Sequence, residues 1–241
     1  PIATIAARLQ GAAGTRVRLE LRRAGVARPF DLTLTRRQIA IPLVSSRLLV
    51  ERGVRVGYVR LSAFAAGAGR QVRQAVSRLT ARGATYLILD LRDNGGGLVQ
   101  EAADLVGDFL PAGKVVATTQ GLHSPKHVLR TGAGSAPTGL PLVVLVNGNT
   151  ASSAEIATGA LQDDRRATVI GTRTFGKGVI QEVLPLPGGG GLRITVAAYR
   201  TPNGRDINHK GIEPSIVVSQ SPSSKTDDVL ARALQFIAAK H

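Results

Sequence analysis

The sequence predicts an α/β fold, in which a layered core of sheet and helices follows a small β-rich segment. Two apolar runs, at 86–91 and 142–146, are near-continuous, as strands are when both of their faces are buried. A helical pattern follows each run, so strands and helices alternate along the chain. Alternation of this kind is typical of a sheet whose strands are joined by crossover connections.

The start of the chain predicts a helix and a pair of strands. Residues 2–10 have a helical pattern, and residues 16–20 and 30–34 alternate apolar and polar side chains, as half-buried strands do. A loop that contains glycine and proline separates the two strands. These elements are too few to bury a core of their own, and a linker is expected at 41–42.

The first half of the core is expected to begin with a strand at 54–61. A helix follows at 70–82, where valine and leucine recur at helical spacing on one face and arginines occupy the other. The buried strand at 86–91 then leads through three glycines into a second helix at 98–109.

The second half of the core continues the same alternation. The buried strand at 142–146 runs directly into a helix, and a glycine-rich turn joins the last two strands. The expected elements are, in order, a strand at 142–146, a helix at 152–162, strands at 167–171, 179–186 and 192–201, and a terminal helix at 227–239.

The composition excludes several kinds of site. Because the chain has no cysteine, a cysteine nucleophile, a disulfide and a thiolate metal site are all ruled out. His123 and His127 would share a face in a helix, but Pro125 lies between them and argues against a helix there. We therefore expect neither a metal nor any other cofactor.

The net charge of +15 has two interpretations. Such a charge attracts acidic partners, nucleic acid or anionic membrane surfaces, and a nucleic-acid binder would lose affinity steeply with salt. The basic residues are scattered, however, and aromatic side chains make up only 3% of the chain. We favour an arginine-rich solvated surface and expect no nucleic-acid partner.

Ser152 is the first candidate for chemistry. It follows a buried strand and opens a helix, where free backbone amides favour developing negative charge. A serine hydroxyl becomes a good nucleophile only when a base removes its proton. The alternative is structural, because Ser152 and Glu155 have the spacing of a capping box, in which the serine only caps the helix.

Lys177 is the candidate base, because a lysine shielded from water can replace histidine in that role. Gly171 and Gly176 precede it at the spacing of a phosphate-binding P-loop, but Gly178 stands where that motif needs serine or threonine. The residues that follow also predict a strand and not a helix, so we reject a nucleotide site. The alternative for Lys177 is a solvated loop lysine.

The glycine run at 95–97 is the third component. Its accessible amides could stabilise an oxyanion, although a tight turn between a strand and a helix explains the run equally well. The candidate nucleophile, the candidate base and the glycine amides each follow the end of a predicted strand. Open α/β sheets bind their ligands at the carboxyl ends of their strands. Together they predict a hydrolase with a Ser-Lys dyad.

These residues resemble the C-terminal processing peptidases, also called tail-specific proteases. The similarity covers roughly 54–218 and keeps the order and spacing of the motifs in that family. The matching segments are DLRDNGGG at 90–97, NTASSAEI at 149–156, GTRTFGKG at 171–178 with Gln181, TPNGR at 201–205 and KGIEP at 210–214.

The resemblance implies a crotonase/Clp-protease-like peptidase core. Ser152 would be the nucleophile and Lys177 the general base, with Gln181 orienting the lysine. The amides of Gly96 and Ser153 would form the oxyanion hole, and Asp163 would support the site. Extended residues four apart are separated by roughly 13 Å, so Gln181 can reach Lys177 only if the chain bends, most simply at Gly178.

The resemblance also implies an organisation and a function. Residues 1–41 resemble the second half of a PDZ domain, 42–219 form the peptidase core, and 220–241 form a tail helix. A PDZ domain binds a C-terminal tail by strand addition, and its carboxylate-binding loop belongs to the first half of the domain. Because residues 1–41 resemble only the second half, we expect them not to bind a C-terminal tail.

The expected function is a serine endopeptidase that cleaves proteins at or near their C-terminal tails through an acyl-enzyme. The resemblance implies substrates with apolar C-termini, an adaptor or activating protein, and a periplasmic or cell-envelope location with membrane-surface association through an upstream anchor. The alternative is a catalytically silent ligand- or protein-binding module of the same fold.

Overall fold

A computed structural model describes residues 8–37, 42–121, 125–132, 138–186 and 190–240. The chain divides into two compact units, Pro1–Pro42 and Leu43–His241. In the first unit, β1 (Arg16–Leu21) and β2 (Phe30–Thr35) form an antiparallel pair, as predicted. Of the predicted helix at 2–10, the described residues include only 8–10, and Arg8 and Leu9 are helical.

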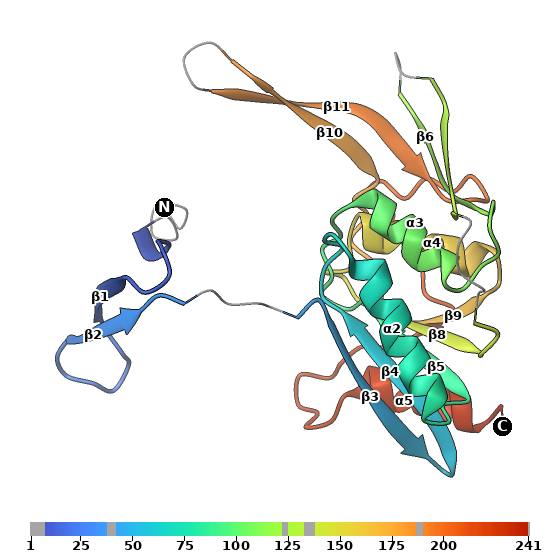
Figure 1. The fold of residues 1–241 in the computed structure, drawn as a ribbon, viewed down its shortest axis with the longest axis horizontal. Helices are drawn as coiled ribbons and strands as arrows, with labels where there is room; N and C mark the ends of the chain where they lie inside the picture. The colour runs from blue at the N-terminus through green and yellow to red at the C-terminus, as the bar shows by residue number, and fades with distance from the viewer. Residues whose placement is uncertain (1–7, 38–41, 122–124, 133–137, 187–189, 241) are drawn as a thin grey trace. The chain divides into compact units, whose positions relative to one another are not determined.

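The second unit is built on a six-stranded sheet with the order β12-β9-β8-β5-β4-β3 (Figure 1). Neighbouring strands from β12 to β4 are parallel, and only β3 is antiparallel to its neighbour. The strands are β3 (Val44–Glu51), β4 (Val54–Leu61), β5 (Tyr86–Asp90), β8 (Leu142–Val146), β9 (Ala167–Gly171) and β12 (Ile216–Val217). The α/β prediction is confirmed, but β3 and β12 were not predicted.

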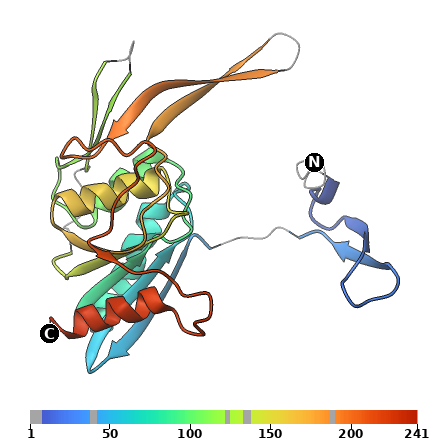
Figure 2. The same cartoon turned by 180° about the vertical axis from the view of Figure 1, so that it is seen from behind.

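Helices cover both faces of this sheet. The helices α2 (Ala68–Ala81), α3 (Val99–Gly107) and α4 (Ser153–Asp163) share one apolar core with Leu87 and Leu89 of β5. Ile88, between these leucines, points to the other face and packs with α5 (Asp228–Ala238), which is seen best from behind (Figure 2). This arrangement explains why β5 reads as a continuous apolar run, since both of its faces are buried.

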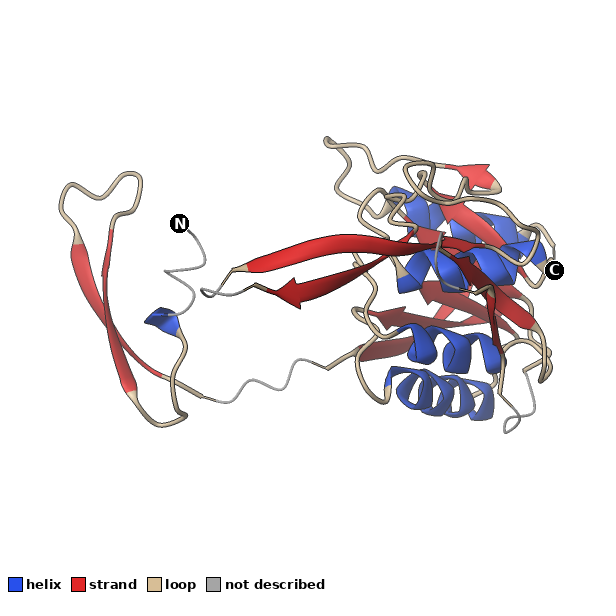
Figure 3. Cartoon of the chain, turned by 90° about the horizontal axis from the view of Figure 1, so that it is seen from above, coloured by secondary structure: helices blue, strands red, loops and turns tan. Residues whose placement is uncertain are grey.

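A second sheet has the strand order β10-β11-β6-β7, and all its pairs are antiparallel. Its strands are β6 (Val115–Gln120), β7 (His127–Arg130), β10 (Val179–Pro185) and β11 (Gly191–Arg200). The hairpin of β10 and β11 was predicted, whereas β6 and β7 were not. This hairpin extends well beyond the layered body of its unit (Figure 3).

The tail helix is fastened to the end of β5 by ion pairs. Arg92 donates to both oxygens of Asp90 and, from its two terminal nitrogens, to both oxygens of Asp227. Asp227 also caps α5 by accepting the Leu230 N–H at 2.9 Å. Although burial alone would raise the pKa of Asp227, hydrogen bonds from Arg92 and the Leu230 amide hold it below its ordinary value.

None of the helices in the described ranges has the length and apolar character that crossing a bilayer requires.

Candidate active site

Three of the predicted site segments lie at the carboxyl edge of the six-stranded sheet. The glycine run at 95–97 follows β5, Ser152 follows β8, and Lys177 follows β9. These three strands are parallel neighbours, so the segments after them emerge at the same edge.

Ser152 has an unusual backbone. Its φ of 57° and ψ of −120° place an L-residue in a sparsely populated conformation, and it is the N-cap of α4. Strain of this kind costs about 1–3 kcal/mol and persists only where the surrounding structure imposes it, often at functional sites. Ser152 is half-buried, while the next residue, Ser153, is fully buried and donates its hydroxyl to the Gly97 carbonyl at 2.8 Å.

Glu155 links the serine segment to the lysine segment. Its side chain is fully buried. One carboxylate oxygen, Oε2, accepts the backbone N–H of Ser152 at 2.9 Å and that of Lys177 at 2.8 Å. The other oxygen, Oε1, accepts the Gly176 N–H at 2.7 Å and the Thr174 hydroxyl at 2.5 Å. Sequence reasoning saw Glu155 only as part of a capping box and missed this second set of partners.

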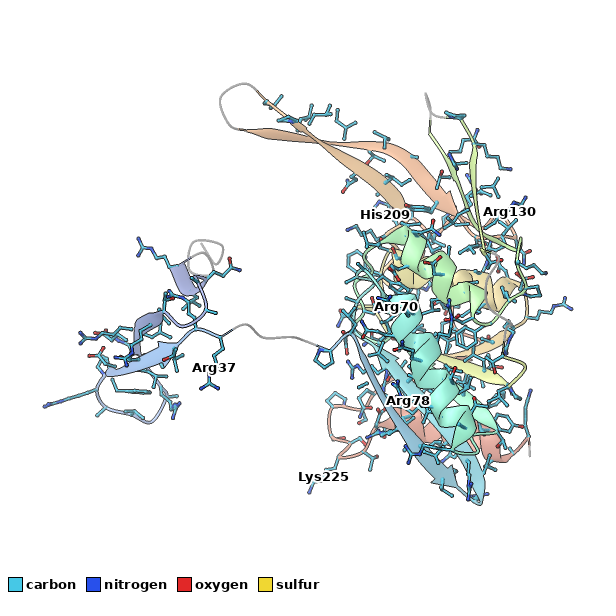
Figure 4. All side chains as sticks on the ribbon, in the orientation of Figure 1. Arg37, Arg70, Arg78, Arg130, His209 and Lys225 are labelled. Atoms are coloured by element: carbon cyan, nitrogen blue, oxygen red, sulfur yellow. The ribbon has the colours of Figure 1, made fainter. Side chains whose placement is uncertain are left out.

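Lys177 projects from a firmly held loop. Gly176, with φ of 87°, accepts the His209 N–H at 2.8 Å, and Figure 4 shows His209 close to where β10 and β11 join the body. A Cβ on Gly178 would lie 2.5 Å from the Asn208 nitrogen, so that position needs glycine. Lys177 itself is exposed, and its ammonium has no ion pair or hydrogen bond with any residue that the structure describes.

Gln181 does not contact Lys177 through a hydrogen bond in the described part of the chain. Its Nε2 atom instead lies 3.4 Å from the hydroxyl of Thr195, across the hairpin, and the residue is exposed. The ladder between β10 and β11 shifts register between Ile180 and Gln181, and β10 begins only after Gly178. The chain therefore bends in this region without joining the two side chains.

Gly96 is the glycine that lies against the serine. Its φ is 93°, and a Cβ built on it would lie 2.7 Å from the Ser152 Cβ and 2.9 Å from the Ser153 nitrogen. The Gly96 N–H donates to the Asn94 side chain at 2.9 Å, so an oxyanion could use this amide only if that bond were released. The Ser153 N–H belongs to the first turn of α4, where amides have no partner within the helix.

Asp163, at the end of α4, holds a neighbouring turn. Its carboxylate is almost fully buried; it accepts the Asn203 N–H at 2.9 Å and pairs with Arg205. These partners belong to the TPNGR segment, which leads into the residues that brace the Lys177 loop. Asp163 is thus tied to the site through that segment.

An acidic side chain next to the glycine run was missed by sequence reasoning. Asp93 has φ of 61° and accepts hydrogen bonds from the side chains of Asn149 at 3.0 Å and Asn147 at 2.8 Å. These two bonds hold the pKa of Asp93 below its ordinary value. They join the segment after β5 to the segment that leads into Ser152.

Comparisons with known proteins point to one family. A model of peptidase family S41 matches residues 55–218. The carboxyl-terminal-processing protease of Synechocystis sp. (strain ATCC 27184 / PCC 6803 / Kazusa) is 43% identical over 235 residues, which are 97% of this chain and 55% of that protein. The carboxy-terminal processing protease CtpA of Bacillus subtilis (strain 168) is 35% identical over 208 residues, 86% of this chain and 44% of that protein.

A solved structure gives the same answer for the fold. The photosystem II D1 C-terminal processing protease is similar with a TM-score of 0.70 and 32% identity, and the match covers 97% of this chain and 63% of that one. The chain spans about half the length of the curated relatives it matches. The shared region is 55% of the Synechocystis protein and 44% of the Bacillus protein.

Proposed function

The chain belongs to peptidase family S41, and on that basis we propose that it is a serine endopeptidase in which Ser152 attacks and Lys177 serves as the base. Its substrates are proteins that are cleaved at or near their C-terminal tails, the activity that gives the relatives their names.

The observation that carries this proposal is the shared carboxylate of Glu155. A single oxygen accepts the backbone N–H groups of both Ser152 and Lys177, so the two segments are fixed to one buried atom. Positioning of this kind is how a fold brings a nucleophile and its base together without relying on either side chain. The strained backbone at Ser152 supports the same interpretation.

The reaction follows from these roles. The Lys177 amine takes the proton of the Ser152 hydroxyl as Oγ bonds to the scissile carbonyl carbon. The tetrahedral oxyanion collapses, the C–N bond breaks, and the lysine returns the proton to the leaving amine. Water then attacks the ester with the lysine again as base, which releases the acid and restores Ser152. An amine accepts a proton only when neutral, a form that a covering substrate favours by excluding water.

The remaining residues receive supporting roles. Ser153 provides an oxyanion amide from the first turn of α4, and Gly96 contributes a second amide once its bond to Asn94 is released. Gln181 orients the lysine after substrate draws it away from Thr195, and Asp163 is a positioning residue for the TPNGR segment.

The organisation and setting are proposed on family membership. Residues 1–41 serve as the second half of a PDZ domain, 42–219 as the peptidase core and 220–241 as a tail helix. The preferred tails are apolar, an adaptor or activating protein assists, and the protein works in the periplasm or cell envelope, with a membrane-surface attachment upstream of residue 1.

Cleavage of a denatured protein tests the proposal. We expect wild type to cleave, and Ser152→Ala and Lys177→Ala to lose at least about a thousandfold in rate, as removal of a nucleophile or its base does. Ser77→Ala, at an exposed serine on α2, is the matched control and should cleave at the wild-type rate. Full activity in either dyad variant would refute the assignment.

The second candidate function is a silent binding module of the same fold. It is favoured by the exposed Lys177 and by the bond of Gln181 to Thr195 instead of to the lysine. The binding module is the better account if the wild-type chain binds unfolded protein but never cleaves it. The same result would be required of a version of the chain that is extended at its N-terminus.

A further inference from the structure

One face of the hairpin of β10 and β11 carries a row of apolar residues, next to which Glu182 occupies the position opposite Ile194. Leu184 lies directly opposite Leu192, and side chains two residues apart on a strand share a face. Leu186 and Ile194 therefore lie on the same face as this pair. All four side chains are substantially exposed, at 44% and 46% for the two on the β10 side and 46% and 39% for the two on β11. We call these four residues the apolar stripe.

The opposite face of the hairpin carries a polar pair closer to the start of β10. Gln181 and Thr195 lie three residues from Leu184 and Leu192, and so on the other face, where their side chains contact each other. Single exposed apolar side chains are common, but a contiguous row on a protruding hairpin marks an interaction surface. A two-stranded hairpin is also marginally stable by itself in water.

The position of β10 points to the kind of partner. Among the described residues, β10 is an edge strand of the second sheet, with β11 on its only paired side. An edge strand presents unpaired N–H and C=O groups that another extended chain can join. This edge begins at Val179, two residues after Lys177, and leads outward to the apolar stripe.

We propose that an extended apolar segment of the polypeptide substrate adds as a strand along the open edge of β10 and continues the apolar stripe. This inference rests on the proposed function, because the substrate segment is placed along β10 only if its scissile bond lies at Ser152. The seven residues of β10 span roughly 23 Å, so about seven substrate residues would pair with it.

A second copy of the chain is the less suitable occupant. A standard interface buries about 800 Å² on each partner. The apolar stripe offers four side chains that are each less than half exposed, which suits one strand better than a folded surface.

Binding to a catalytically silent chain tests this inference apart from the reaction. The probe is a fluorescent peptide of about ten residues that alternates leucine and serine, titrated with the full chain carrying Ser152→Ala. Adding Leu184→Ser and Leu186→Ser should raise the Kd at least tenfold. The matched control adds Val50→Ser and Val217→Ser, which are 66% and 67% exposed and lie in the other sheet, and should leave the Kd unchanged. An unchanged Kd in the leucine variant overturns the inference.

Modified peptides test strand pairing without altering the protein. The same probe with N-methyl groups on alternate residues loses the donors of one edge, and one of the two alternate sets should abolish binding. Equal binding by both sets would show that no strand is added. If sedimentation shows a dimer that only the leucine variant dissociates, while peptide binding persists, the apolar stripe joins two copies and the inference fails. Loss of protein cleavage with retained peptide binding would instead count against the dyad alone.

Discussion

Ser152 and Lys177 donate their backbone N–H groups to the same carboxylate oxygen of Glu155, at 2.9 Å and 2.8 Å. The two residues are far apart in the sequence, yet this one buried atom fixes the spacing of their backbones. The same side chain also accepts the Gly176 amide and the Thr174 hydroxyl, so it organises the whole loop before Lys177.

Replacing Glu155 by glutamine should impair both stability and activity. The amide would present an NH₂ donor to backbone N–H donors, and each buried group left unsatisfied costs about 1–3 kcal/mol. We expect urea unfolding at lower concentration and at least tenfold slower cleavage. Glu213→Gln is the control, since that side chain is 54% exposed in an ion pair with Arg173, and it should unfold like wild type. Unaltered cleavage by Glu155→Gln would remove Glu155 from the account.

Gly96 and Gly95 offer a matched pair of substitutions. A methyl group at Gly96 would lie 2.7 Å from the Ser152 Cβ and from the Ala151 carbonyl oxygen, at a φ that L-residues rarely adopt. A methyl group at Gly95 meets nothing within 4 Å. Cleavage assays should therefore find Gly96→Ala nearly inactive and Gly95→Ala close to wild type. The reverse order would contradict the assignment of Gly96 to the site.

Asp108 should make stability depend on pH. Burial raises the pKa of Asp108 to about 6, against the opposing effect of Arg73 on α2, while Asp104 on α3 adds to the rise. The folded chain therefore binds a proton more tightly than the unfolded chain does. The resulting stability is complete below the ordinary value of 3.8 and is lost as the pH rises through 6.

Asp108→Asn checks this linkage, because one Asp108 oxygen is buried without a hydrogen-bond partner among the described residues. We expect the unfolding free energy at pH 7 to rise by about 1–3 kcal/mol relative to wild type. Between pH 4 and 6 the two proteins should converge. Glu213→Gln, at a carboxylate that is 54% exposed, serves as the control and should keep the pH dependence of wild type. An identical pH dependence in wild type and Asp108→Asn would contradict the prediction.

Arg92→Lys should loosen the tail helix. A lysine keeps the charge but cannot bind Asp90 and Asp227 together with paired nitrogens as the guanidinium does. Amide hydrogen exchange in α5 should accelerate, while exchange in α2 stays unchanged. Arg78→Lys is the control, because Arg78 lies on the outer face of α2 (Figure 4) and has no ion pair in the described part of the chain. Equal protection of α5 in both variants would show that the arginine bridge does not hold this helix.

Much of the fold could be predicted because burial shapes the sequence directly. The strands β5 and β8 are covered on both faces and read as apolar runs, and α2 shows its buried face as a helical repeat. The strand β3 pairs only with β4 and is largely exposed or half-exposed, so its residues carry a weak pattern. The two residues of β12 are too short for any pattern.

The site could be predicted in its parts but not in its assembly. The pattern around Ser152 predicted a helix start, and the spacing of Glu155 predicted a cap. The Thr174 hydroxyl and the Gly176 N–H, which donate to Oε1 of Glu155, come from the loop before Lys177. No local sequence pattern encodes a contact between such distant segments. Likewise, three adjacent glycines look alike in sequence, and only the backbone shows that Gly96 faces Ser152.

The dyad is tested most directly by mass spectrometry of the chain after exposure to a serine-reactive fluorophosphonate. The account predicts one adduct, on Ser152, that forms in wild type and in the control Lys225→Ala but at a rate at least about a hundredfold lower in Lys177→Ala. An adduct on another residue, or equal labelling of Lys177→Ala and wild type, would contradict the assignment of Ser152 and Lys177 as nucleophile and base.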